Sequence, residues 1–184
     1  MTRRLFFPLL CSFILWLPLH ALAGDPQASS NADLATADQL YHSGKFAEAA
    51  DKYQSMVKTD PNLVAAQAGL IRSLLHEQKV DDALAAATSA LALQPNSAAL
   101  LAAMGDVDFR RAQMPEAETA YQKAVRADSR EVHAYLGLTR LYRAYSLYRH
   151  AYDELQLAHQ IAPDDPEVQR MWLAHLSRRE RIAG

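Results

Sequence analysis

Apolar residues between positions 30 and 165 recur with the three- and four-residue spacing of helices that bury one face. Short polar segments such as Ser43-Gly44-Lys45 interrupt this spacing and indicate turns between helices. Two segments, Asn96-Ser97 and Asp165-Pro166, have the capping side chain that is typical of a helix start. The pattern therefore predicts an all-α chain of consecutive short helices.

The helical pattern repeats every 34 residues. The repeat consists of proline, alanine and large apolar positions: Pro61, Pro95 and Pro163; Ala49, Ala83, Ala117 and Ala151; Met56, Ala90, Ala124 and Ala158; Phe46, Val80, Met114 and Tyr148. This spacing predicts four units, at 30–63, 64–97, 98–131 and 132–165, each made of two helices. The first helix of a unit is expected to start at the unit boundary, and the second near the Phe46-type position.

These positions resemble the tetratricopeptide-repeat (TPR) family, which has a small residue at unit position 8, alanine at 20 and 27, and aromatic residues at 11, 17 and 24. The resemblance implies a right-handed α-solenoid of four helix-turn-helix units over 30–165. Small residues allow paired helices to approach closely, and large ones fill the remaining space. Ile71 departs from the rule at position 8, and we expect the small Ala87 at position 24 to compensate for its volume.

Both ends of the repeat domain need a cover, because a repeat buries its apolar face only against its neighbours. We interpret residues 166–184 as a capping helix and tail. Its Trp172, Leu173 and Leu176 are expected to face the last repeat, with Arg170 and His175 outward. Residues 24–29 are interpreted as a flexible leader.

The first 23 residues have the organisation of a secretory signal peptide. Arg3 and Arg4 precede an apolar run, and Ala21-Leu22-Ala23 provides a small-residue cleavage site. A membrane anchor is disfavoured, because the run is shorter than the roughly 20 residues that span a bilayer. A lipoprotein site at Cys11 is disfavoured by the large residues before it and the apolar sequence after it. We therefore expect an exported, periplasmic protein cleaved after Ala23.

Cleavage would remove the single cysteine and two arginines, leaving 17 basic against 21 acidic residues, a net charge of −4. This mild acidity disfavours nucleic acid or an anionic membrane as a direct partner, so a membrane is reached only through another protein. The histidines form no pair at metal-binding helical spacing, and the sequence has neither a phosphate loop nor a nucleophile elbow. We expect no enzyme activity, metal, cofactor or small-molecule substrate.

Tyrosines and arginines interleave between Tyr135 and Tyr152, a composition that can also serve nucleic-acid stacking. Tyr135, Tyr142 and Tyr148 fall at unit positions that the family uses for the core, so we favour core packing. A second protein-contact surface around Tyr145 and Tyr152 is the alternative.

In the TPR family the first helices line a concave groove, through unit positions 2, 5, 9, 12 and 13. Carried over to this sequence, the rule gives an exposed apolar stripe that ends at a basic patch. The predicted peptide-binding residues are Tyr41, Arg72, Leu75, Phe109, Arg110, Leu136, Arg140 and Arg143. The family's carboxylate clamp is not expected, because Leu34 and Asp38 stand where it needs lysine and asparagine.

Position 9 alternates in charge from unit to unit: Asp38, Arg72, Asp106, Arg140. One interpretation is a set of ion pairs between neighbouring units, and the other is a set of ligand contacts. At the level of function, two classes remain. The first is a scaffold or adaptor that binds a protein or peptide segment in the assembly of an envelope, pilus or secretion complex. The second is the N-terminal scaffold of a longer exported hydrolase or protease.

Overall fold

The computed structural model describes residues 26–183, with the side chains of residues 30–177. This part of the chain forms nine α-helices and no strand. The helices are α1 (Pro26–His42), α2 (Phe46–Thr59), α3 (Val64–His76), α4 (Val80–Leu93), α5 (Ala98–Arg110), α6 (Met114–Ala127), α7 (Val132–Ala144), α8 (Tyr148–Ile161) and α9 (Pro166–Ala183). The expected signal peptide lies outside the described residues.

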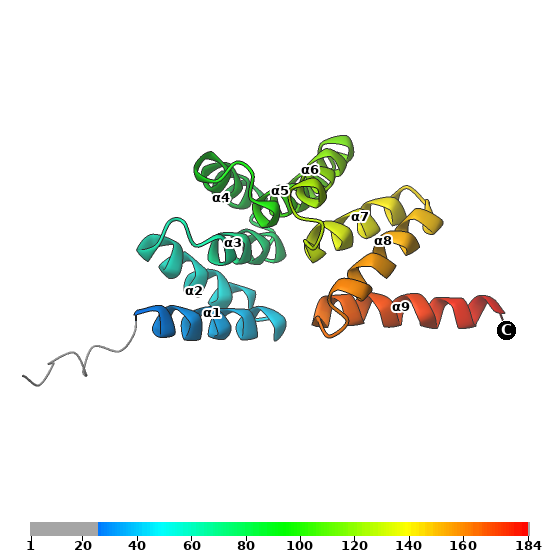
Figure 1. The fold of residues 1–184 in the computed structure, drawn as a ribbon, viewed down its shortest axis with the longest axis horizontal. Coiled ribbons are helices and arrows are strands. Elements are labelled where there is room, and N and C mark those ends of the chain that lie inside the picture. The colour runs from blue at the N-terminus through cyan, green and yellow to red at the C-terminus, as the bar shows by residue number, and fades with distance from the viewer. Residues whose placement is uncertain (1–25, 184) are drawn as a thin grey trace, which may run out of the picture.

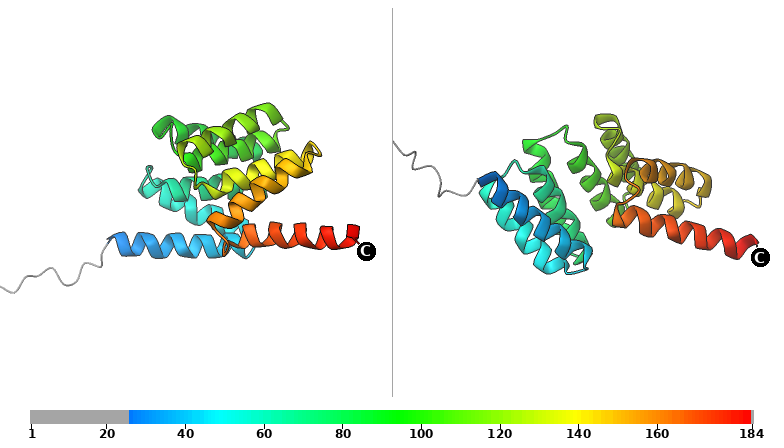
Figure 2. Two further views of the ribbon diagram at one scale, coloured as in Figure 1. Left: turned by 45° about the vertical axis from the view of Figure 1, so that its right-hand side comes forward. Right: turned by 60° about the horizontal axis from the view of Figure 1, so that its bottom comes forward.

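The helices pair in chain order, α1 with α2 through α7 with α8, and α9 packs against α8. The first helices of neighbouring units also contact one another, α1 with α3, α3 with α5 and α5 with α7. Figure 1 shows the helices following one another around an arc that brings α9 back toward α1, and Figure 2 shows the same arc from two other sides. The fold is the all-α helical repeat solenoid that the 34-residue spacing predicts.

The helix starts agree closely with the repeat positions. The second helices begin at the Phe46-type residues of all four units, and α3, α5 and α7 begin at the expected boundaries. Asp165 caps α9 through its Oδ1, which accepts hydrogen bonds from Glu167 N (2.8 Å) and Val168 N (2.9 Å), whereas Ser97 makes no side-chain cap. The leader expected at 24–29 is wrong from Pro26 onward, because α1 starts there, at a residue whose ring presets φ for a first helical position.

Each unit turns between its two helices through a residue in the left-handed region, and these residues are themselves 34 apart. They are Gly44 (φ 81°), Gln78 (φ 65°), Ala112 (φ 60°) and Ser146 (φ 60°). Only the first is glycine, the residue that adopts this conformation without steric cost. The repeat geometry therefore imposes the turn on three residues that do not favour it.

In the core between neighbouring units, the side chain at unit position 24 packs against the residue at position 6 of the next unit, and the two are matched in size. A Cβ on Gly69 would lie 2.4 Å from the Tyr53 ring, and one on Gly137 would lie 2.2 Å from the Tyr121 ring. In the second unit, where Ala87 replaces the tyrosine, Ile71 and Ala103 share its core cluster and all three are fully buried. The predicted compensation between Ile71 and Ala87 is consistent with this packing, and it extends into the following unit.

The expected orientation of α9 is confirmed for Trp172, which packs against α8, and is wrong for Leu173, Leu176 and His175. Val168 is fully buried against Leu155 and Leu136, with Met171 and Trp172 beside them, whereas Leu173 is 63% exposed and Leu176 is 39% exposed. His175, expected outward, is half-buried and stacks on Tyr152 at a ring distance of 4.8 Å. The helix is thus rotated relative to the prediction, because it continues the repeat register and presents its first-helix face to α8.

Candidate functional site

A cavity of about 250 Å³ opens on the face formed by the first helices. Every residue that lines it comes from α1, α3, α5, α7 or α9: Tyr41, Arg72, Leu75, His76, Asp106, Phe109, Arg110, His133, Arg140 and Glu167. Three arginines stand against two carboxylates in this lining, beside two aromatic rings and a leucine. The cavity is thus suited to a segment that carries both an apolar and an acidic side chain.

Six of the eight predicted groove residues line this cavity: Tyr41, Arg72, Leu75, Phe109, Arg110 and Arg140. Leu136 does not, because it is fully buried in the core beside Leu155 and Val168. The predicted exposed apolar stripe is also wrong in part, since Leu75 is only 4% exposed and Phe109 is half-buried against the core. Neighbouring first helices contact one another closely, so position 12 lies largely between them.

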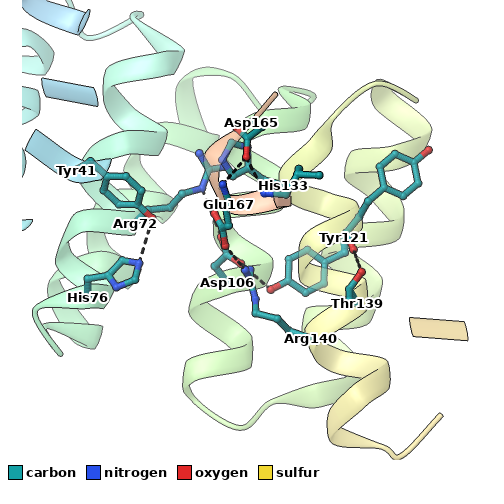
Figure 3. A network of polar contacts seen from close by, with 12 residues as sticks. Tyr41, Arg72, His76, Asp106, Tyr121, His133, Thr139, Arg140, Asp165 and Glu167 are labelled. Carbon is teal, nitrogen blue, oxygen red and sulfur yellow. Dashed lines mark hydrogen bonds and ion pairs between the residues drawn. The ribbon is translucent and has the colours of Figure 1, made fainter. Parts of the chain in front are cut away.

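Asp106 is the centre of a buried network of polar contacts in the cavity wall (Figure 3). Its Oδ1 accepts hydrogen bonds from Tyr121 Oη (2.8 Å) and from Arg140, and its Oδ2 lies 3.5 Å from Arg72 Nε. The alternating charges at position 9 therefore form ion pairs between units, as one of the two interpretations held. The pairs link Arg72, Asp106 and Arg140; the first residue of the series, Asp38, instead accepts a 2.6 Å hydrogen bond from Tyr53.

Arg140 extends this network into α9, because its second terminal nitrogen donates a 2.8 Å hydrogen bond to Glu167 Oε1. Burial opposes the charge on Arg140, but the carboxylates of Asp106 and Glu167 outweigh it and raise the pKa of the guanidinium. Arg140 is thus permanently charged and already paired, so the expected basic patch of Arg110, Arg140 and Arg143 loses one member to an internal contact.

Arg72 differs from Arg140 in how completely it is paired. Its Nε and one terminal nitrogen are buried and have no hydrogen-bond partner among the described residues, although the side chain lies in the cavity wall. Buried guanidinium nitrogens without a partner are costly, so Arg72 is less well satisfied than Arg140. Arg72 therefore lines the cavity as an incompletely paired cation, beside the exposed Arg110.

The rim on the α1 side is aromatic. Tyr41 Oη lies 3.1 Å from His76 Nε2, and the His76 ring stacks on Phe46 at 4.0 Å. Burial, reinforced by the charge of Glu167, raises the pKa of Tyr41 to about 12, and burial lowers the pKa of His76 below its ordinary value. Both side chains are therefore neutral near pH 7, and this rim offers apolar surface and neutral hydrogen-bonding groups.

A second cleft, of about 420 Å³, lies between the end of α1 and the start of α9. Arg143 lines this cleft rather than the first cavity, together with Arg170 and Met171 from α9 and Phe46 from α2. The two hollows share Tyr41, His76, Arg140 and Glu167. The predicted groove residues are therefore divided between a central cavity and the gap where the two ends of the arc approach each other.

The groove rule of unit positions 2, 5, 9, 12 and 13 already includes His76, Asp106 and His133, although they were not among the predicted peptide-binding residues, whereas Glu167 was missed. A signal for Asp106 was present, because Asp38 and Tyr53 are separated by the same 15 residues as Asp106 and Tyr121, and both pairs are hydrogen-bonded. Glu167 lies beyond the four predicted units, 34 residues after His133 and at the same position in the register. Its place depends on how far the arc curves, which no spacing in the sequence specifies.

The Tyr/Arg-rich stretch is divided as well. Tyr135 is buried, Tyr142 is half-buried, and Tyr152 stacks on Trp172 at 6.1 Å, so these rings pack as expected. Tyr148 is 60% exposed, which contradicts its expected core position. Tyr145 is 43% exposed.

Within residues 26–183, no helix is long and apolar enough to cross a membrane. Among the described side chains, no group of three or more histidine, cysteine, aspartate or glutamate residues could hold a metal ion.

Residues 40–107 match the family model of the tetratricopeptide repeat. The same two-helix unit continues to residue 165 at the same 34-residue spacing, and the single helix α9 follows. Residues 40–107 are therefore a tetratricopeptide-repeat region. Proteins of this family are generally protein-interaction scaffolds without enzyme activity, and the TPR fold of this chain suggests a scaffold for protein interaction. No curated protein sequence matches the chain.

Solved structures of other TPR proteins have a similar fold at low sequence identity. TTC0263, a thermophilic TPR protein of Thermus thermophilus, is 19% identical with a TM-score of 0.62, covering 76% of this chain and 77% of its own. The pilF protein of Pseudomonas aeruginosa is 17% identical with a TM-score of 0.58, covering 84% and 70%. The first TPR domain of human RPAP3 is 18% identical with a TM-score of 0.55, covering 65% and 94%. At these identities the likeness concerns the fold alone.

Proposed function

We propose that this protein is a non-enzymatic, exported scaffold or adaptor that holds an extended segment of another protein in its central cavity. The observation that carries the proposal is the lining of that cavity, where Tyr41 and Phe109 lie beside the incompletely paired Arg72 and the exposed Arg110. An acidic side chain of the segment would pair with Arg72, and a neighbouring apolar side chain would pack on the two rings. Such aromatic and arginine anchors dominate the energy of many interfaces.

The proposed setting is the assembly of an envelope, pilus or secretion complex outside the cytoplasm. It is supported by the basic, apolar and small-residue regions of residues 1–23. Mass spectrometry of the protein from its native cell should find a chain that begins at Gly24. A cytoplasmic protein that keeps Met1 would contradict the proposed export.

The cavity is tested by capture of the native partner on immobilised wild-type and variant protein. Arg110→Ala and Phe109→Ala should each weaken capture, the latter by about 2 kcal/mol or more if the ring is a central anchor. Because Phe109 also packs against the core, the Phe109→Ala variant should melt at a lower temperature than the wild type. Arg110 is exposed, so the Arg110→Ala variant should keep the wild-type fold.

Tyr152→Ala is the matched variant at the alternative binding surface on the C-terminal helices. Tyr152 packs on Trp172 between α8 and α9 and lines neither hollow. It should leave capture unchanged. Capture that is lost in Tyr152→Ala and retained in Arg110→Ala would move the binding site to the C-terminal helices.

A further inference from the structure

One face of α9 lacks the cover that the same face has in each complete unit. Unit position 8 is occupied by Ala37, Ile71, Gly105 and Thr139 in the four units, and all four are buried beneath the second helix of their own unit. In α9 the same position is Leu173, which is 63% exposed, and position 11 is Leu176, which is 39% exposed. No described helix covers these two leucines.

This face is separate from the cavity and from the contact with α8. Val168, Met171 and Trp172 hold α9 against the preceding unit, while Glu167 and Arg170 line the hollows of the concave side. Helix α9 thus makes two of the contacts of a first helix, one with the preceding unit and one with the groove. It lacks the third, which is the contact with a second helix of the same unit. A leucine pair at helical spacing on such a face is apolar surface that a folded chain normally buries.

We propose that the Leu173–Leu176 face of α9 docks an amphipathic helix of a partner protein, in the place that the second helix occupies in every unit. This surface is independent of the proposed function of the central cavity, because none of its residues lines that cavity.

The size rule of the core indicates what the docked helix presents. A large residue at position 8 occurs once in the complete units, at Ile71, and its partner helix α4 offers three alanines inward, Ala83, Ala87 and Ala90. Units with a small residue there, such as Gly105, pack a tyrosine instead. Leu173 is large, so the fitting helix has small residues at three positions spaced as in α4.

The charge of α9 indicates which charged residues the docked helix carries. The sequence of α9 contains four arginines and two glutamates, a balance of +2, and three of the arginines fall at 178, 179 and 181. A second helix runs antiparallel to the first and starts beside its C-terminal end, so the first turn of the docked helix lies along the half of α9 in whose sequence these arginines fall. Acidic residues there are favoured, as in α4 with Asp81 and Asp82. A second copy of α9 is a poor occupant, because its first-turn Glu167 is already paired with Arg140.

The test uses the full chain and two fluorescent peptides, one with the sequence of residues 78–95 and one with Ala87→Tyr in the same sequence. Fluorescence anisotropy should show that the first peptide binds at least tenfold more tightly than the second. Leu173→Asp and Leu176→Asp should each weaken binding of the first peptide by at least tenfold. Both positions are on the surface, and circular dichroism should show unchanged helical content.

The matched control is Leu93→Asp, at an apolar position of similar exposure (56%) on α4. It should leave the affinity unchanged, as should the cavity variant Arg110→Ala. The proposal is overturned if neither peptide binds, if both bind equally, or if Leu93→Asp weakens binding as much as Leu173→Asp. Sedimentation that shows a wild-type dimer converted to monomer by Leu173→Asp would assign the face to a second copy instead.

Discussion

Tyr121 lies between two glycines of different helices, Gly105 in its own unit and Gly137 in the next. A Cβ at either position would approach the ring to 2.6 Å or less, well inside van der Waals contact. The tyrosine is fully buried and its hydroxyl hydrogen-bonds Asp106 at 2.8 Å, so the ring has no room to shift away. At the scale of the residue, the stability of the array depends on matched pairs of large and small side chains.

Gly137→Ala should therefore destabilise the protein by about 1–3 kcal/mol through overpacking. This sign is opposite to the usual gain of about 1 kcal/mol for replacing glycine inside a helix. Urea unfolding measures the difference. In a Tyr121→Ala background the same substitution should cost little or nothing, as at the Ala87 and Ala103 pair. Equal costs in both backgrounds would show that the ring is not the obstacle.

The compensation within one unit, Ile71 with Ala87, could be predicted because the TPR pattern marks both positions. The glycines at position 6, Gly69 and Gly137, could not, because that position is not part of the pattern. Glycine is required at this position because the tyrosine ring of the preceding unit leaves no room for a Cβ atom. This requirement can be recognised only once the distance between the units is known.

At the scale of the element, a charged side chain caps the start of α7. Glu131 accepts a hydrogen bond from His133 N (3.2 Å), and the same Oε1 lies 3.3 Å from His133 Nδ1. Burial tends to raise the pKa of Glu131, but the hydrogen bond and charge of His133 outweigh it, so the pKa lies below its ordinary value.

A carboxyl with a lowered pKa in the folded state stabilises the fold above its unfolded pKa, near 4.5, and this contribution is lost as the pH falls through the folded value. Glu131→Gln should cost about 1 kcal/mol at pH 7, as for the loss of a helix cap, and nearly nothing at pH 3. Thermal melts at the two pH values measure this. Glu116→Gln, in the exposed first turn of α6, should change neither; a pH-independent loss for Glu131→Gln would contradict the assigned role.

Helix boundaries were the most predictable elements, since each second helix starts at the Phe46-type position. The orientation of α9 was not. Hydrophobicity suggested that its leucines face inward, whereas the register that continues from the four units places Val168 and Trp172 against α8 and leaves Leu173 outside. In a repeat protein the register carries more information than the hydrophobicity of a single helix.

At the scale of the whole molecule, the network around Asp106 joins three units and the last helix. Arg72 on α3, Asp106 on α5, Arg140 on α7 and Glu167 on α9 form one continuous series of ion pairs. The alternating signs at position 9 predicted the middle of this series. Its last member and the cavity that it encloses depend on the curvature of the arc, which the sequence does not reveal.

Asp106→Ala should destabilise the protein by about 3 kcal/mol, because it leaves two largely buried arginines without their shared carboxylate. It should also lower the cooperativity of urea unfolding, with the first two units melting apart from the last two. Asp38→Ala is the matched control, since Asp38 has the same unit position as Asp106 and accepts a hydrogen bond from Tyr53, the equivalent of Tyr121, without arginine ion pairs. Similar losses from the two variants, with one sharp transition in each, would contradict the coupling.

The matched side chains between units also determine the order in which the units can follow one another. Exchanging the second and third units would set the Tyr53 ring against Ala103, where it has no space, and would leave a void between Ala87 and Gly137. Each junction therefore accepts only a neighbour whose residue at position 6 matches the side chain at position 24, and the four units are not interchangeable modules. A chain built by shuffling them should fold only in those permutations where every tyrosine at position 24 is followed by a glycine at position 6.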